Sequence, residues 1–142
     1  MPLTKLAHYL IFANDLETSK NFYVDVLGLE VGARPPFPFP GYWLYLGDTA
    51  CVHMAPAALG AGQKEYLGEE RIVGDNTGAV DHIAFNATEL AVFVERAEAH
   101  GIELLHRIVP EDGSYQVFFR DPNGIKIELT FPGAEAEQLS GH

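Results

Sequence analysis

The stretch AHYLIFANDLETSKNFYVDVLGLEV, residues 7–31, decides the fold, because it returns in altered form as DHIAFNATELAVFVERAEAHGIEL, residues 81–104. In each copy a histidine opens an apolar strand, and an acidic residue followed by leucine lies seven and eight positions further on. A helical pattern follows and ends at a glycine, Gly28 or Gly101. Self-similarity of this kind is typical of duplicated supersecondary units. We therefore predict two copies of one module.

Apolar periodicity and turn residues predict the same order of elements in both copies. The first copy has one helix capped by Asn14 or Asp15, with predicted strands at 5–12, from 29, at 42–47 and at 50–54. The second copy has a helix at 89–100 capped by Thr88, with predicted strands at 80–86, 102–108, 115–120 and 125–131. An Asp-Pro-Asn-Gly turn at 121–124 joins the last two strands. Each module has the order β-α-β-β-β, and the fold class is α+β.

The length of 142 residues is enough for one sizeable core, so we expect a single domain over 1–142. It divides into a module at 4–55, a linker at 56–78, a module at 79–132 and a tail at 133–142. The linker holds five glycines and no clear period. The tail is small, polar and acidic, so we expect it to be loosely held.

Charge and cysteine content exclude several kinds of partner. The chain has 9 basic and 20 acidic residues, a formal charge of −11, which argues against binding to nucleic acid or to anionic membrane surfaces. The single Cys51 excludes an intrachain disulfide and fits a reducing compartment. No secretory signal or membrane-spanning apolar run is evident. We therefore expect a cytoplasmic protein whose partner is a small molecule.

Four ligand-type side chains recur with matched spacing. His8 and His53 are 45 residues apart, and His82 and Glu128 are 46 apart. Strand alternation permits them to converge: Glu128 lies on the strand face opposite the apolar row of Ile127 and Leu129, and His53 lies opposite Val52 and Met54. His8 shares its face with Leu10 and Phe12, and His82 shares its face with Ala84 and Asn86. Three imidazoles and one carboxylate suit Fe²⁺, Ni²⁺, Zn²⁺ or Mn²⁺. If His53 is not a ligand, the remaining two histidines and one carboxylate leave three coordination positions open.

The aromatic segment RPPFPFPGYWLYL, residues 34–46, leaves two interpretations open. It is either a lip over an apolar or aromatic substrate, or a proline-stiffened strand entry whose rings pack in the core or at a dimer interface. The candidate substrate contacts, in and beyond this segment, are Phe12, Trp43, Tyr45, Asn86 and Tyr115.

The segments HYLIFANDLETSKNFYVDVLGL, VDHIAFNA and FFRDPNGIKIEL resemble the vicinal oxygen chelate superfamily over residues 4–132. That superfamily includes glyoxalase I, bleomycin and fosfomycin resistance proteins, and extradiol dioxygenases. The resemblance implies a half-open, barrel-like cup in which His8, His53, His82 and Glu128 bind a divalent transition metal. In short members two chains commonly build each site, so it also implies a homodimer. We expect sites that combine His8 and His53 of one chain with His82 and Glu128 of the other.

Three positions depart from individual subfamilies. Phe12 replaces an arginine that helps glyoxalase I hold glutathione, and His53 replaces its usual glutamate or glutamine. Phe118 replaces a tyrosine that assists extradiol dioxygenases. A non-thiol, oxygen-bearing apolar substrate is therefore favoured.

Three functions follow from the resemblance. The first is a lyase or isomerase of the glyoxalase type, in which adjacent substrate oxygens chelate the metal and Glu128 or His53 moves a proton. The second is an Fe²⁺-dependent dioxygenase that cleaves catechols or hydroquinones. The third is a resistance protein that sequesters an aromatic compound without catalysis.

Overall fold

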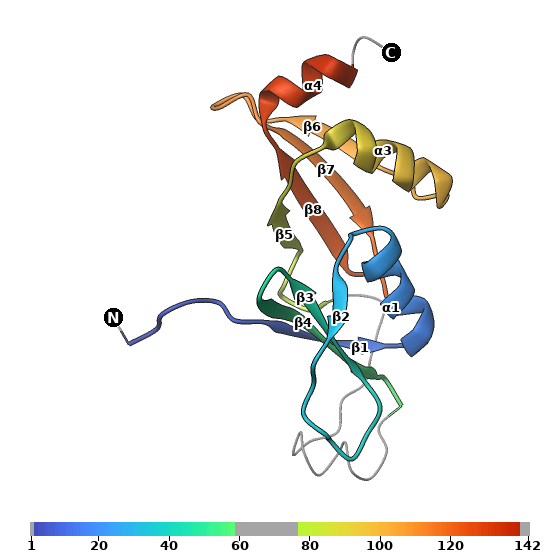
Figure 1. Ribbon diagram of the computed structural model, residues 1–142. Coiled ribbons are helices and arrows are strands. Elements are labelled where there is room, and N and C mark those ends of the chain that lie inside the picture. Colours follow the sequence, from blue (N-terminus) through green and yellow to red (C-terminus); the bar gives the residue numbers. More distant parts are fainter. Residues whose placement is uncertain (1, 59–76, 140–142) are drawn as a thin grey trace. The chain divides into compact units, whose positions relative to one another are not determined.

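The computed structural model describes residues 2–58 and 77–139 (Figure 1). The contacts divide the chain into two compact units, Met1–Gly74 and Asp75–His142. Most of the predicted linker at 56–78 lies outside the described residues. The grouping of both modules into one domain stays a prediction.

In its described residues, the first unit is a four-stranded mixed sheet with one helix. Its elements are β1 (Tyr9–Ala13), α1 (Leu16–Asp25), β2 (Glu30–Gly32), β3 (Tyr42–Leu46) and β4 (Thr49–Pro56). The strand order is β1-β4-β3-β2, with β1 parallel to β4 and the other pairs antiparallel.

The second unit repeats this arrangement. Its elements are β5 (Ile83–Asn86), α3 (Leu90–Ala99), β6 (Leu105–Ile108), β7 (Tyr115–Arg120), β8 (Lys126–Phe131) and α4 (Gly133–Leu139). The strand order is β5-β8-β7-β6, with β5 parallel to β8. The predicted α+β fold with two βαβββ modules is confirmed.

Strand alternation gives each sheet one face covered by helix and one that carries the polar candidates. In β8, Ile127 and Leu129 are buried, whereas Glu128 between them belongs to the opposite face. Phe93 of α3 packs against the rings of Phe119 and Phe131 on the apolar face. The first unit has the same plan, since α1 contacts β3 and β4. The helices therefore fix which face remains available for a site.

The predicted turn at 121–124 is confirmed, and it shapes the entry into β8. The Asp121 carboxylate is buried and accepts hydrogen bonds from the backbone N–H groups of Asn123 and Ile125, both at 2.8 Å. Gly124 has φ +84°, a conformation that favours glycine. This turn sets the register in which β7 presents Phe118 opposite Glu128.

The two equivalent helices begin differently. Asp15 caps α1, as predicted, by accepting a hydrogen bond from the Thr18 N–H at 2.8 Å. The predicted cap at Thr88 is wrong, because the residue before α3 is Glu89 in a left-handed conformation, with no side-chain cap of its own. The Leu90 N–H donates instead to the Glu135 carboxylate of α4, at 2.9 Å.

The expectation of a loosely held tail is also wrong for residues 133–139. They form α4, which contacts α3 and β7. Helix α4 begins close to the backbone of Gly113. A Cβ atom on Gly133 would lie 2.3 Å from the carbonyl oxygen of Gly113. The polar composition of the tail gave no sign that one of its carboxylates accepts a hydrogen bond from a backbone N–H of another helix. That N–H would otherwise have no partner within its helix.

We predict that Glu135→Ala destabilises the second unit, because it leaves the Leu90 N–H without its partner. Loss of a capping acceptor costs about 1 kcal/mol, which urea unfolding followed by circular dichroism can measure. Glu98→Ala, an exposed glutamate of α3, is the matched control and should change stability far less. Equal stabilities for the two variants would contradict the capping role.

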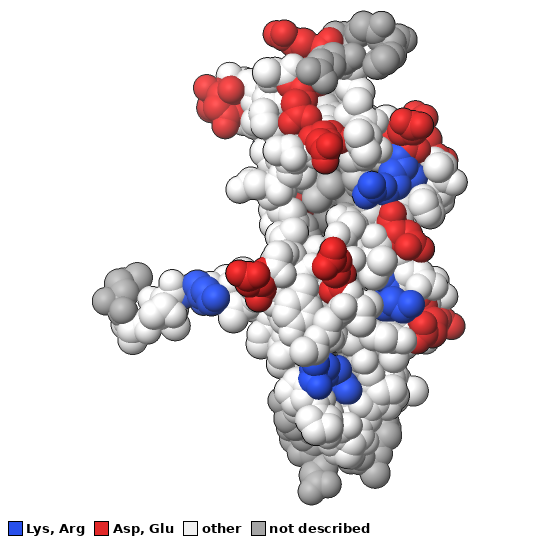
Figure 2. Space-filling model, viewed as in Figure 1, with Lys and Arg blue, Asp and Glu red and all other residues white. Residues whose placement is uncertain are grey.

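The surface is acidic and holds no broad basic area on the face in view. On that face, among the described residues, the Lys and Arg side chains are scattered and form no broad cluster (Figure 2). None of the helices in the described ranges combines the length and apolar character needed to cross a membrane.

Candidate metal centre

The first unit brings His8 and His53 into direct contact. His8 immediately precedes β1 and is exposed, and His53 lies in β4. Their rings stack with centroids 3.7 Å apart and planes inclined by 13°. Trp43 of β3 stacks on the other side of His53, at 3.9 Å. Burial, followed by the neighbouring His8, lowers the pKa of His53, which favours the neutral ring that a metal requires.

Stacking limits how these two histidines can share one ion. The metal-binding lone pair of an imidazole lies in its ring plane, and the planes of these two stacked rings are nearly parallel and separate, so one ion cannot lie in both. His8 and His53 can therefore bind the same ion only after one ring turns. His8 is the residue suited to turn, because it lies outside the strand and only His53 is held between two rings.

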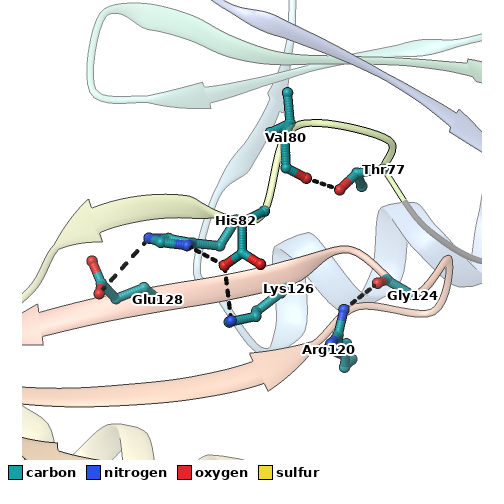
Figure 3. A network of polar contacts seen from close by, with 8 residues as sticks. Thr77, Val80, His82, Arg120, Gly124, Lys126 and Glu128 are labelled. Atoms are coloured by element: carbon teal, nitrogen blue, oxygen red, sulfur yellow. Dashed lines mark hydrogen bonds and ion pairs between the residues drawn. The ribbon is translucent and has the colours of Figure 1, made fainter.

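The second unit brings His82 and Glu128 together (Figure 3). The Nε2 atom of His82 lies 3.9 Å from Oε1 of Glu128. Its other nitrogen, Nδ1, lies 2.8 Å from Oδ2 of Asp81. Because an ionised carboxylate only accepts hydrogen bonds, Nδ1 carries a proton, so in the neutral ring it is Nε2, the nitrogen nearer Glu128, that has the lone pair for a metal. This is the tautomer that a metal between His82 and Glu128 would need.

Lys126 fixes the carboxylate that orients His82. Its ammonium donates to Oδ2 of Asp81 at 2.9 Å and lies 5.6 Å from the ring centre of Phe118. Hydrogen bonds from Lys126 and then from His82 lower the pKa of Asp81 to about 2. Asp81 is therefore ionised at every pH at which the histidines can bind a metal.

Strand register shows that the two pairs are equivalent within their units. Leu10, two residues after His8, is opposite His53 on the parallel neighbour. Ala84, two residues after His82, is opposite Glu128 in the same way. The structure thus agrees with the matched spacing in the sequence.

The predicted substrate contacts of the first unit separate into two groups. Trp43 lines a cavity of about 430 Å³ together with His8, His53 and residues of the 34–39 segment. Phe12 and Tyr45 are not among its lining residues. The Tyr45 hydroxyl donates a hydrogen bond to the carbonyl oxygen of Ala33 at 2.6 Å.

The two candidates of the second unit lie on different faces of their sheet. Asn86 lines a different cavity, of about 440 Å³, with Thr130 among its other walls. Tyr115 is opposite Phe131 in the register and so belongs to the helix-covered face, where its hydroxyl contacts Nδ1 of His106 at 2.7 Å. This placement gives no support to Tyr115 as a substrate contact.

Sequence-based prediction omitted Asp81 and Lys126. The signal for Asp81 was present, since an acidic residue directly precedes His82. The role of Lys126 depends on a contact across 45 residues and had no local signal. Within the part of the chain that the structure describes, no group of three or more His, Cys, Asp or Glu side chains is arranged to hold a metal. Each unit contributes a pair.

This fold and these residues define a class of protein, in which a βαβββ module is duplicated and each module carries a pair of potential metal ligands. A family model described as the Glyoxalase/Bleomycin resistance protein/Dioxygenase superfamily matches residues 5–129, and the chain belongs to this superfamily. It is 32% identical over 130 residues to "Glyoxylase I 4" of Arabidopsis thaliana, covering 89% of this chain and 70% of that protein.

Two solved structures share the fold. The lactoylglutathione lyase of Agrobacterium tumefaciens has a TM-score of 0.67 and 24% identity, covering 92% of this chain and 95% of its own. A fosfomycin resistance protein of Listeria monocytogenes has a TM-score of 0.68 and 16% identity, covering 94% and 97%. The predicted membership of the vicinal oxygen chelate superfamily is confirmed.

Proposed function

We propose that the chain is a metal-dependent enzyme of the glyoxalase type, a lyase or isomerase that acts on a small apolar or aromatic molecule with two adjacent oxygens. The proposed ligands are His8, His53, His82 and Glu128, and the proposed ions are Fe²⁺, Ni²⁺, Zn²⁺ and Mn²⁺. The observation that carries the proposal is the hydrogen bond from His82 Nδ1 to Asp81, which leaves Nε2, the nitrogen nearer Glu128, with the lone pair for a metal. Relatives named as glyoxylase and lactoylglutathione lyase support the reaction type.

The donor set fits such an ion. Three neutral imidazoles and one carboxylate are borderline ligands of the kind that these transition metals prefer. When bound, the metal supplies Lewis-acid stabilisation of negative charge that develops on the substrate oxygens. Two pairs, one from each of two units, complete the set, and we propose that the units come from different chains of a homodimer.

The protein's own residues supply the proton transfer and the pocket. The side chain of Glu128 is 13% exposed. When it is displaced from the metal, its carboxylate is suited to accept a proton from a carbon beside the substrate carbonyl and to return it to the neighbouring carbon. His53 is the alternative base in a site that it does not ligate. Trp43 and the aromatic segment hold the apolar part of the substrate and exclude water.

Metal content and proton exchange test this function. Protein purified anaerobically should contain about one transition-metal ion per site. Metal-loaded protein should accelerate the exchange of the α-hydrogens of 2-hydroxyacetophenone in D₂O, followed by proton NMR, whereas Glu128→Gln should not. Protein that takes up none of the four metals would overturn the proposal.

One observation favours the dioxygenase alternative. His53 is held between His8 and Trp43, and if it stays there, His8, His82 and Glu128 leave three positions open for substrate and oxygen. Oxygen uptake by Fe²⁺-loaded protein with catechol or hydroquinone, without exchange of the ketone, would select this alternative. Tight binding of an aromatic compound by metal-free protein, with neither activity, would select sequestration.

The Asp81 hydrogen bond gives a further prediction. Asp81→Asn replaces an acceptor that fixes the His82 tautomer with an amide that can turn its N–H₂ toward the ring. Metal affinity should fall by about 10-fold to 100-fold, the usual effect of changing a residue that orients a ligand. Competition with a fluorescent chelator measures it. Asp112→Asn is the matched control, because Asp112 also accepts two hydrogen bonds, both from Ser114. An unchanged affinity in Asp81→Asn would remove this role.

A further inference from the structure

Among the described residues, Arg34 is the only arginine or lysine that lines the His53 cavity. Its Cζ atom lies 5.0 Å from the ring centre of Phe37 and 5.2 Å from that of Phe39. One N–H group of Nη2 donates to the carbonyl oxygen of Phe39 at 2.8 Å. A guanidinium has five N–H donors, so most of its hydrogen-bonding capacity is left for another acceptor.

The surroundings hold Arg34 in place. Prolines at 35, 36, 38 and 40 restrict the backbone of the segment. The rings of Phe37 and Phe39 stack on each other with centroids 5.4 Å apart. A Cβ on Gly41 would lie 3.0 Å from Nη2 of Arg34 and 2.5 Å from the carbonyl oxygen of Met54, so the arginine lies against a glycine that only just leaves it room. A group fixed in this way is ready for a ligand without further ordering.

Arg34 also lacks an acidic partner. Among the described residues no carboxylate forms an ion pair with it, although the chain has 20 acidic residues against 9 basic ones. In so acidic a chain, a half-buried cation without a carboxylate stands out, because burial of an unpaired charge is unfavourable. The planar fork of a guanidinium matches the two oxygens of a carboxylate.

We propose that the substrate is an aromatic carboxylate whose carboxylate binds Arg34 and whose ring lies along Trp43 and Phe37. Trp43 stacks on His53 at 3.9 Å and lies 6.3 Å from Phe37, so the rings lead from the candidate metal ligands to Arg34. The carboxylate is therefore at the end of the substrate remote from its two adjacent oxygens. This inference names the substrate class of the proposed function and rests on it for the reaction, although the binding step can be tested alone.

The test compares three probes that do not absorb where tryptophan is excited: 3-phenylpropanoate, its amide, and propanoate. Trp43 is the only tryptophan of the chain, so its fluorescence reports binding in this cavity. Wild-type protein should bind the aromatic acid about tenfold more tightly than the amide, a difference of about 1.4 kcal/mol, and propanoate more weakly than either. Calorimetry gives the same ratios independently.

The variants separate recognition from structure. Arg34→Gln should bring the ratio of acid to amide affinity close to one while the amide still binds, and Arg34→Lys should restore part of it. Arg107→Gln makes the same change of charge at an exposed position of β6 and should keep the wild-type ratio. If Arg34 only braced the segment, Arg34→Gln would weaken both ligands equally, and that result would overturn the proposal.

The outcome is independent of the metal. The titrations are repeated on chelator-treated protein and on His82→Ala, a replacement in the second unit at a residue that does not line the cavity. If metal never binds but the acid is still preferred, the proposed function fails and this inference stands. If metal binds but wild type does not distinguish acid from amide, this inference alone fails.

Discussion

Replacing His82 with alanine is expected to abolish stoichiometric metal binding while the fold survives. His82 is the candidate ligand whose coordinating nitrogen is already set by a hydrogen bond, and Glu128 lies 3.9 Å from that nitrogen. Removal of one of four ligands lowers metal affinity by more than the 10-fold to 100-fold that follows changes to orienting residues. His8→Ala and Glu128→Ala should have the same effect. Metal content by mass spectrometry after gel filtration is the measurement.

The control is His106→Ala, since His106 is an exposed histidine of β6 that we do not assign to the site. It should retain full metal content. Circular dichroism and thermal unfolding of each variant should resemble wild type, because the side chains of His8 and His82 are exposed and Glu128 belongs to the face opposite the core. His82→Ala protein that keeps one metal per site would remove His82 from the ligand set.

His53→Ala separates the two catalytic proposals. If His53 is a ligand, its loss should reduce metal content as the other three replacements do. If it remains stacked between His8 and Trp43, metal content should persist, and the two-histidine, one-carboxylate site of the dioxygenase alternative gains support.

Mixing His8→Ala chains with Glu128→Ala chains is expected to restore metal binding and activity that neither variant has alone. The proposed sites take His8 and His53 from one chain and His82 and Glu128 from the other. A heterodimer then holds one intact site and one site damaged twice, so about half of its metal binding should return. Sites formed within one chain would each be damaged once, and nothing would return.

Mixing requires that subunits exchange, which co-expression with two different affinity tags ensures. Mixed His82→Ala and Glu128→Ala chains are the matched control, because both changes fall in the same unit and every shared site would be damaged. Recovery in this control would contradict the proposed division of ligands. Light scattering of the wild-type protein at micromolar concentration tests the dimer itself, and a monomer would exclude shared sites.

Much of the fold was predictable because it depends on local patterns. The alternation in β8 predicts that Ile127 and Leu129 are buried and that Glu128 is on the other face, and both hold. The cap at Asp15 follows from its side chain and the helical pattern beside it. At Thr88 the same argument failed, because a carboxylate from residue 135 bonds to the first N–H of α3 instead.

The candidate site was predictable only in part, because local patterns indicate some of its features and contacts between distant residues decide the others. The spacing of His8, His53, His82 and Glu128 predicted two equivalent pairs, and strand register agrees with it. Strand alternation also indicates which face of β7 carries Tyr115. Val117 and Phe119 share that face and are buried, but the prediction that Tyr115 contacts the substrate did not use this alternation.

By itself the sequence determined the duplicated βαβββ order, the buried face of β8 and the matched pairs of candidate ligands, because they depend on repeats, periodicity and turn chemistry that can be read from the residues. Only the tertiary structure decided that His8 stacks on His53, that Lys126 holds Asp81, and that Phe37 and Phe39 hold Arg34 beside the cavity. These contacts arise when packing brings particular atoms within a few ångströms of each other. Residue types and spacing do not specify such distances. The distances in turn set which nitrogen of His82 carries a proton, which ring must turn, and which cation has no acidic partner among the described residues.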